Sequence, residues 1–182
     1  MSKLPFAQWM LVLVGIAALN VSAKLGETEE QSRQRYGEPL KKPEDVFRYQ
    51  PILDGAVNLT YKFQGWWIRS AYVHGKTVRI SYVKMNKPDV NPAIQDNELQ
   101  AVLESEADGG KWQAKSNGTF HPDQFLDHTV GHLTTWINTN GDTARLDATR
   151  LQLVFESPAA ADFIAARDAE QELRRNSNTA KF

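Results

Sequence analysis

The sequence predicts an α+β fold: an antiparallel sheet with a short N-terminal helix, a central helix and a C-terminal helix. Two observations predict the sheet. Residues 63–84 and 133–147 each contain two runs rich in aromatic and β-branched residues on either side of a short turn. A third observation predicts the helices, because residues that cap helices stand at Thr28 and Asp96, and Ser157-Pro158 opens a terminal segment.

The first hairpin turns at His74-Gly75. We predict a three-residue loop with Gly75 as the left-handed residue of a bulge, because this register gathers the apolar side chains on one face. A two-residue loop would pair Ile68 with Ser81 and divide these side chains between both faces. The predicted face consists of Trp66, Ile68, Ser70, Tyr72, Val78, Ile80 and Tyr82.

The second hairpin is predicted to turn at Asn140-Gly141 through a two-residue loop. Ile137 then pairs with Ala144, and Trp136 lies opposite Arg145, where the guanidinium can stack on the indole. The apolar face expected from this register consists of Leu133, Ile137, Ala144 and Leu146.

The N-terminal helix is defined by its two ends. Thr28 can cap it, Gln31 can complete a capping box, and Gly37 is placed for a left-handed exit. Its side chains are almost all polar, which favours a solvated helix held by its caps. A recognition helix for a partner is the alternative interpretation, with Arg33 as the candidate contact.

The central helix is predicted to begin at a cap provided by Asp96 and to end at Gly109-Gly110. Its apolar stripe faces the sheet and consists of Leu99, Val102 and Leu103. Three carboxylates fall outside this stripe, and we predict a solvated acidic face rather than an acid–base pair: Glu98, Glu104 and Glu106. The terminal helix has sparse apolar anchors, namely Phe163, Ile164 and Leu173.

The first 23 residues are typical of a secretory signal peptide. Lys3 precedes an apolar run at residues 6–19, and Val21-Ser22-Ala23 offers small residues for cleavage after Ala23. Cleavage would make the protein periplasmic or secreted. A retained membrane anchor is the alternative, because residues 4–23 are just long enough to span a bilayer.

The remaining chain is predicted to form one α+β domain at residues 24–175, with a disordered tail at 176–182. The domain can be divided into two similar halves, 24–86 and 92–156, each with a helix followed by strands. An edge strand is expected at residues 46–49. The chain contains no Cys, which excludes disulfides and thiolate metal sites. Its formal net charge of −1 is far from the basic balance of proteins that bind nucleic acid.

The segment LGETEEQSRQRYGEP, residues 25–39, resembles the opening of a family of uncharacterised exported bacterial proteins. The resemblance continues at GKTVRISYVK, ELQAVLES, GGKW and WINTNGDTARLD. The same segment is locally similar to the first helix of SmpA/OmlA-type envelope lipoproteins, but this chain lacks their lipid-attachment Cys. The resemblance to the exported family implies a secreted α+β layout and assigns no activity.

The segment HPDQFLDHTVGH, residues 121–132, is the one stretch with candidate metal chemistry. Its candidate ligands are His121, Asp127, His128 and His132. A metalloprotease helix would carry Glu directly after its first histidine, where Thr129 stands. Because Gly131 weakens a helix here and residues 134–137 have the pattern of a strand, we predict that these residues form no metal site.

The sequence favours an exported, non-catalytic envelope protein that binds another protein or a surface component. We expect no cofactor, no nucleic acid partner, and membrane contact only if residues 1–23 are retained. A histidine-centred metal protein, such as a hydrolase, is the alternative. The candidate binding surface consists of Arg33, Trp67 and Trp136; an exposed platform of Tyr61, Trp67 and Trp136 competes with the more common burial of tryptophan in a core.

Overall fold

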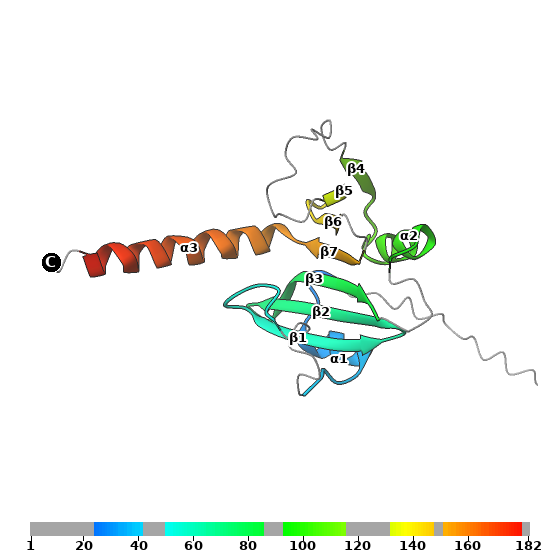
Figure 1. The fold of residues 1–182 in the computed structure, drawn as a ribbon, viewed down its shortest axis with the longest axis horizontal. Coiled ribbons are helices and arrows are strands. Elements are labelled where there is room, and N and C mark those ends of the chain that lie inside the picture. Colours follow the sequence, from blue (N-terminus) through cyan, green and yellow to red (C-terminus); the bar gives the residue numbers. More distant parts are fainter. Residues whose placement is uncertain (1–23, 42–49, 86–92, 116–131, 148–150, 180–182) are drawn as a thin grey trace, which may run out of the picture.

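The computed structural model describes residues 24–41, 50–85, 93–115, 132–147 and 151–179. These residues form a seven-stranded antiparallel sheet and three helices (Figure 1), so the predicted fold class is confirmed. The elements are α1 (Glu29–Tyr36), β1 (Val57–Phe63), β2 (Trp66–Val73), β3 (Lys76–Lys84), α2 (Asp96–Ser105), β4 (Trp112–Lys115), β5 (His132–Asn138), β6 (Thr143–Asp147), β7 (Gln152–Glu156) and α3 (Pro158–Thr179).

The sheet is built from two contiguous blocks of strands. Its order is β1-β2-β3-β7-β6-β5-β4, so residues 24–86 supply one block and the later strands supply the other. The blocks meet where β3 pairs with β7, over residues 79–83 and 152–156. One continuous sheet therefore runs through the whole domain.

One face of the sheet is apolar, and we call it the helix face because α1 and α2 pack against it. Ile80 and Phe155 of the strands are fully buried there, together with Tyr36 of α1 and Leu103 of α2. The predicted stripe of the central helix does pack against this core.

The other face, which we call the polar face, carries the alternate residues of the same strands, among them Arg69, Arg79 and Glu156. Its apolar part is a small cluster beside the first turns of α3, around Ala71, Val78 and Ala160. Most of the buried apolar residues of the described chain therefore lie on the helix face.

The first hairpin has a two-residue turn, and the predicted three-residue loop is wrong. Val73 pairs directly with Lys76. His74 and Gly75 both have positive φ, 50° and 74°. A two-residue turn with this backbone conformation has a twist that matches the twist of the two antiparallel strands.

A bulge in β3 restores the predicted pairing farther along the same hairpin. Val78 is the extra residue, and beyond it Ile68 pairs with Tyr82 as predicted. The bulge also places Val78 in the cluster of the polar face instead of on the helix face. A regular hairpin with a two-residue turn would divide the apolar side chains between both faces. The bulge allows the two-residue turn and still keeps most of these side chains on one face.

The loop of the second hairpin contains three residues, so the predicted two-residue turn at Asn140-Gly141 is wrong. The Asn138 N–H donates to the Asp142 carbonyl at 2.8 Å, which closes the loop around residues 139–141. Gly141 has a φ of 92° and supplies the left-handed residue that such loops require.

The longer loop moves the second hairpin one step from its predicted register. Trp136 pairs with Ala144, and Arg145 pairs with Thr135. Trp136 therefore packs on the helix face, Ile137 is exposed, and the predicted stacking of Trp136 on Arg145 is not formed.

The caps of α1 are confirmed, whereas the predicted cap of α2 is wrong by one residue. Thr28 and Gln31 form the capping box, and Gly37 leaves the helix with a φ of 85°. α2 begins at Asp96, so its cap is Gln95, whose N–H donates to Glu98 at 2.8 Å. Glu98 stands three residues after Gln95, which is the spacing of a capping box.

α3 is longer and less anchored than predicted. It runs to Thr179, so residues 176–179 are helical where we expected the start of a disordered tail. Phe163 and Ile164 pack against the small cluster of the polar face, but Leu173 is 71% exposed and is not an anchor.

Residues 1–23 and the predicted edge strand at 46–49 lie outside the described residues. Among the helices of the described ranges, none combines the length and the apolar character needed to cross a membrane.

Candidate functional site

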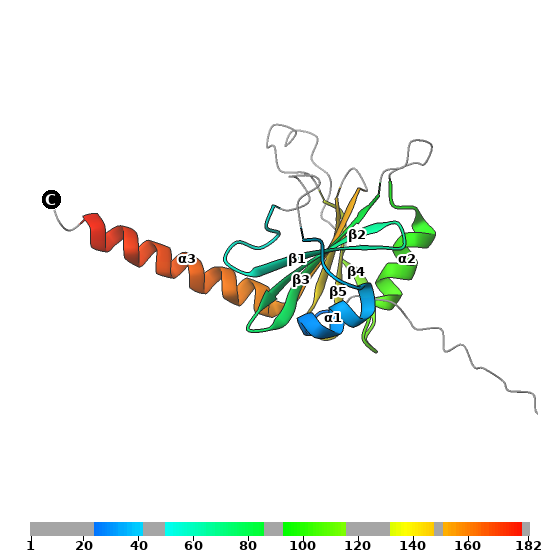
Figure 2. The same cartoon turned by 90° about the horizontal axis from the view of Figure 1, so that it is seen from below.

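The outer part of α3 is the first candidate site. The helix is attached to the domain at its beginning, where Ala160 is buried and Arg167 donates to the Asp54 carbonyl at 3.2 Å. Residues 168–177, in contrast, are all exposed. Figures 1 and 2 show this part of the helix pointing away from the sheet.

This outer part carries a narrow apolar stripe and charged side chains of both signs. Ala166, Ala169 and Leu173 share one side of the helix and are all exposed. Arg174 pairs with Glu170 at 2.6 Å within the helix. Residues 168–177 contain three acidic side chains, Asp168, Glu170 and Glu172, and two basic ones, Arg174 and Arg175.

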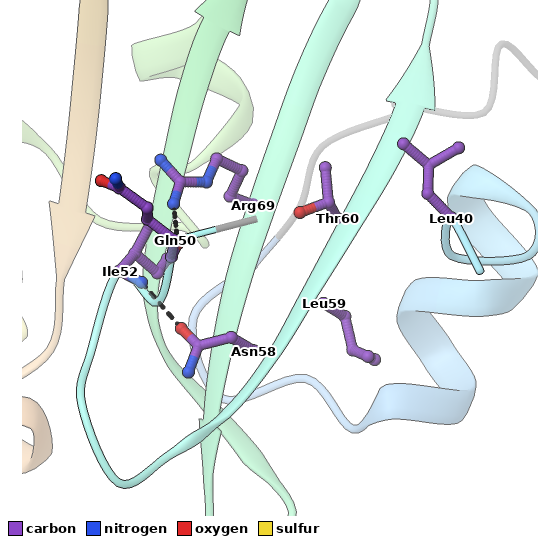
Figure 3. A pocket seen from close by; sticks show the side chains of 7 residues that line it. All are labelled: Leu40, Gln50, Ile52, Asn58, Leu59, Thr60 and Arg69. Atoms are coloured by element: carbon purple, nitrogen blue, oxygen red, sulfur yellow. Dashed lines mark hydrogen bonds between the residues drawn. The ribbon is translucent and has the colours of Figure 1, made fainter. Parts of the chain in front are cut away.

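A small pocket between β1, β2 and the segment that precedes β1 is the second candidate site (Figure 3). Its lining includes Gln50, Ile52, Asn58, Leu59, Thr60 and Arg69. The Asn58 side chain fixes one wall, because its Oδ1 accepts from the Ile52 N–H at 2.9 Å and its Nδ2 donates to the Leu53 carbonyl at 2.9 Å. The segment that forms this wall is therefore held in place by the strand itself.

Arg69 is the charged group of this pocket. It is 8% exposed, and its guanidinium donates to the Gln50 carbonyl, as Figure 3 shows. No carboxylate of the described residues pairs with it. Arg79 on the same face differs, because its Nε lies 2.8 Å from Glu156. Burial lowers the pKa of Arg69, since the charged form is poorly solvated.

A buried carboxyl group lies between the helices on the helix face. Glu106 follows α2 directly, is 4% exposed, and accepts a hydrogen bond of 2.7 Å from the Tyr82 hydroxyl. Its Oε2 is buried without a hydrogen bond within the described part of the chain. Burial raises the pKa of Glu106 well above its ordinary value, and the nearby charge of Glu27 raises it further.

The predicted acidic face of the central helix is therefore wrong in part. Glu106 is buried, and Glu98 is partly buried and pairs with Lys84 at 2.8 Å. Glu104 alone of the three is exposed. Because α2 ends at Ser105, the helical periodicity that placed Glu106 in solvent does not extend to it.

The predicted binding-surface residues do not come together. Arg33 pairs with Glu29 one turn earlier on α1. Trp67 is 4% exposed on the polar face, whereas Tyr61 and Trp136 lie in the core of the helix face. The aromatic platform expected from Tyr61, Trp67 and Trp136 is not formed.

The histidine segment is almost entirely outside the described residues. This applies to His121, Asp127 and His128, while His132 begins β5, where its backbone pairs with Asp147. Within the described ranges, no group of three or more His, Asp or Glu side chains is arranged to hold a metal ion. The interpretation of this segment stays a prediction.

The sequence did not single out Arg69, and it placed Glu106 on a solvated face although this residue is buried. Arg69 alternates with the apolar residues of β2, which predicts a solvent-facing side chain, and no local pattern shows that the segment at Gln50 covers it. The chain matches no family model, no curated protein and no solved structure.

Proposed function

We propose that this chain is an exported, non-catalytic protein of the bacterial envelope that binds another protein through the outer part of α3. The order of Lys3, the apolar run at residues 6–19 and the small residues before Ala23 supports export to the periplasm or beyond. The resemblance of residues 25–39 to exported bacterial proteins points the same way.

The exposure of residues 168–177 carries the proposal. A helical stretch this short is marginally stable by itself in water, because the packing of an apolar side supplies most of the stability of helices in proteins. Leu173 is 71% exposed on a stripe with Ala166 and Ala169. A groove of a partner protein that receives this stripe would supply the missing packing.

The charge of this part of α3 favours a protein partner. Nucleic acid and anionic membrane surfaces bind clusters of Lys and Arg, whereas residues 168–177 carry two basic and three acidic side chains. The short apolar stripe and the charges of both signs suit a groove with an apolar floor and a mixed polar rim.

The test is photo-cross-linking in the native host, with a photoreactive amino acid in place of Ala169 of the full-length chain. We expect one dominant adduct. Leu173→Glu should lower its yield at least about tenfold, because an anchoring leucine contributes about 1.5–3 kcal/mol when buried. The intact mass of the purified chain reports whether residues 1–23 have been removed.

Gln171→Glu is the matched control, because Gln171 is exposed on the other side of the helix and the substitution adds the same charge. Its adduct yield should stay within about twofold of the unmodified chain. Equal yields for the Leu173→Glu and Gln171→Glu variants would show that the apolar stripe does not bind the partner.

A further inference from the structure

The pocket at Arg69 contains a buried cation for which the described chain supplies no anion. Arg69 lies in the middle of β2, opposite Thr60 of β1 and Ser81 of β3. Its one described hydrogen bond goes to the neutral Gln50 carbonyl. A guanidinium has five N–H donors and stays protonated, so one carbonyl leaves most of these donors without a partner among the described residues.

Two other arginines on the polar face, Arg79 and Arg145, are paired with a carboxylate. Glu156 accepts from Arg79 at 2.8 Å and from Arg145 at 2.9 Å. Arg79 and Arg145 are half-buried, so both are more accessible to water than Arg69, which is 8% exposed. The most buried of the three arginines is thus the one that no carboxylate of the described residues pairs with, although buried charges in proteins are normally paired.

We propose that this pocket binds a carboxylate group, presented by a small organic acid or by the C-terminus of a peptide. The planar guanidinium matches a carboxylate through two parallel hydrogen bonds, and a single negative charge balances its single positive charge. Phosphate sites, in contrast, combine several cations or helix N-termini around a larger charge.

The walls of the pocket define the rest of the ligand. Ile52 and Leu40 are the apolar residues of the lining, whereas the Leu59 side chain packs against the core of the helix face. The Asn58 amide is occupied by the backbone of residues 52–56, so it shapes the pocket without being free for the ligand. The hollow measures about 50 Å³, which is room for a carboxylate group at its open mouth and excludes a large cofactor.

The test is an NMR titration of the ¹⁵N-labelled full-length chain, observed at the Arg69 Nε–Hε group and the Thr60 amide. The probes are N-acetyl-leucine and an acetylated pentapeptide ending in leucine, each compared with its C-terminal amide. We expect a saturable shift with the carboxylates and none with the amides. Comparable affinities for both carboxylates identify a site for small acids, and at least about tenfold tighter binding of the pentapeptide identifies a site for peptide ends.

Arg69→Gln should weaken carboxylate binding at least about tenfold, because it removes the charge and the guanidinium fork. Lys62→Gln is the matched control, since Lys62 is an exposed cation on the same face, and its effect should stay within about twofold. If the Arg69→Gln variant fails to fold, Arg69→Lys replaces it in the test. Lysine keeps the positive charge but lacks the planar guanidinium, so we expect this variant to bind the carboxylates more weakly.

Three results would overturn the site: no saturable shift with either carboxylate, equal shifts with acids and amides, or binding unchanged by substitution of Arg69. The titration uses the purified chain without a partner, so its outcome is independent of the role of α3.

Discussion

Glu106 is the buried carboxyl group through which we expect the folding of this protein to depend on pH. The groups that face it come from three parts of the chain: Tyr82 from β3, Tyr36 from α1, and Glu27, which pairs with Arg35. The pKa of Glu106 is raised first by burial and then by Glu27, while the Tyr82 hydrogen bond and Arg35 act in the opposite direction. The neutral carboxyl is therefore the form that the folded protein favours.

We predict that Glu106→Gln removes part of the pH dependence of the free energy of unfolding. In the unfolded chain a glutamate has a pKa of about 4.3. Because the folded pKa is higher, the contribution of Glu106 to stability is complete below about pH 4 and is lost as the pH rises through the folded pKa. The variant should therefore gain stability over the natural chain between pH 5 and pH 8, as measured by urea unfolding.

The matched control for this prediction is Glu172→Gln, which makes the same change at an exposed position of α3. Its urea midpoint should follow that of the natural chain at both pH values. Parallel pH profiles for the natural chain and Glu106→Gln would show that the buried carboxyl does not titrate as the structure implies.

At the residue scale, the sequence could identify the core but not the buried charges. Alternation along a strand predicts that Ile68, Ile80 and Tyr82 share a face, and they do. The burial of Arg69 and Glu106 depends on a loop and a helix end that fold over them. Such contacts leave no periodic signal in the sequence.

At the scale of single elements, both hairpins were located correctly, but each predicted loop differed from the observed one by one residue. Apolar alternation specifies a face, yet two different loops can present the same face if a bulge compensates. Val78 is such a compensation in the first hairpin. The second hairpin has a longer loop than predicted. There the Asn140 side chain donates to the Asp142 carboxylate and accepts from the Asp142 N–H, which holds the three-residue loop together.

The connection between α2 and β4 contains Gly110, where there is no space for a side chain. A methyl group at Gly110 would lie 2.0 Å from the Asn138 Oδ1 and 2.8 Å from the Thr139 Oγ1. Asn138 is 2% exposed and donates to the Ala107 carbonyl at 3.0 Å, so it has little freedom to move. The glycine lets this connection approach the end of β5 closely.

We predict that Gly110→Ala lowers the free energy of unfolding by about 1–3 kcal/mol, the usual effect of overpacking a filled site. Urea unfolding measures this loss. Lys111→Ala is the control at the next position, where the side chain is exposed, and it should change stability by less than about 0.5 kcal/mol. A neutral Gly110→Ala variant would mean that Asn138 can move aside.

At the scale of the whole molecule, the sequence predicted the class of the fold but not the order of the strands. The two blocks are joined by the pairing of β3 with β7, in which Arg79 contacts Glu156 from 77 positions away. Alternation predicts which side of a strand is apolar, whereas it contains no information on which strands become neighbours. The sequence therefore could not predict that β3 and β7 pair and join the two blocks into one sheet.

Glu156 connects three strands at this junction, because it accepts from Arg79 of β3 and Arg145 of β6. We predict that Glu156→Gln lowers the free energy of unfolding by about 2 kcal/mol, since two partly buried guanidinium groups lose their anion. Hydrogen exchange in increasing urea should show the same loss for amides of β2 and of β6, because one continuous sheet unfolds as a unit. Glu170→Gln breaks an exposed pair on α3 and should cost less than about 0.5 kcal/mol. If exchange accelerates in β6 while β2 keeps its protection, the two blocks unfold separately and the junction does not couple them.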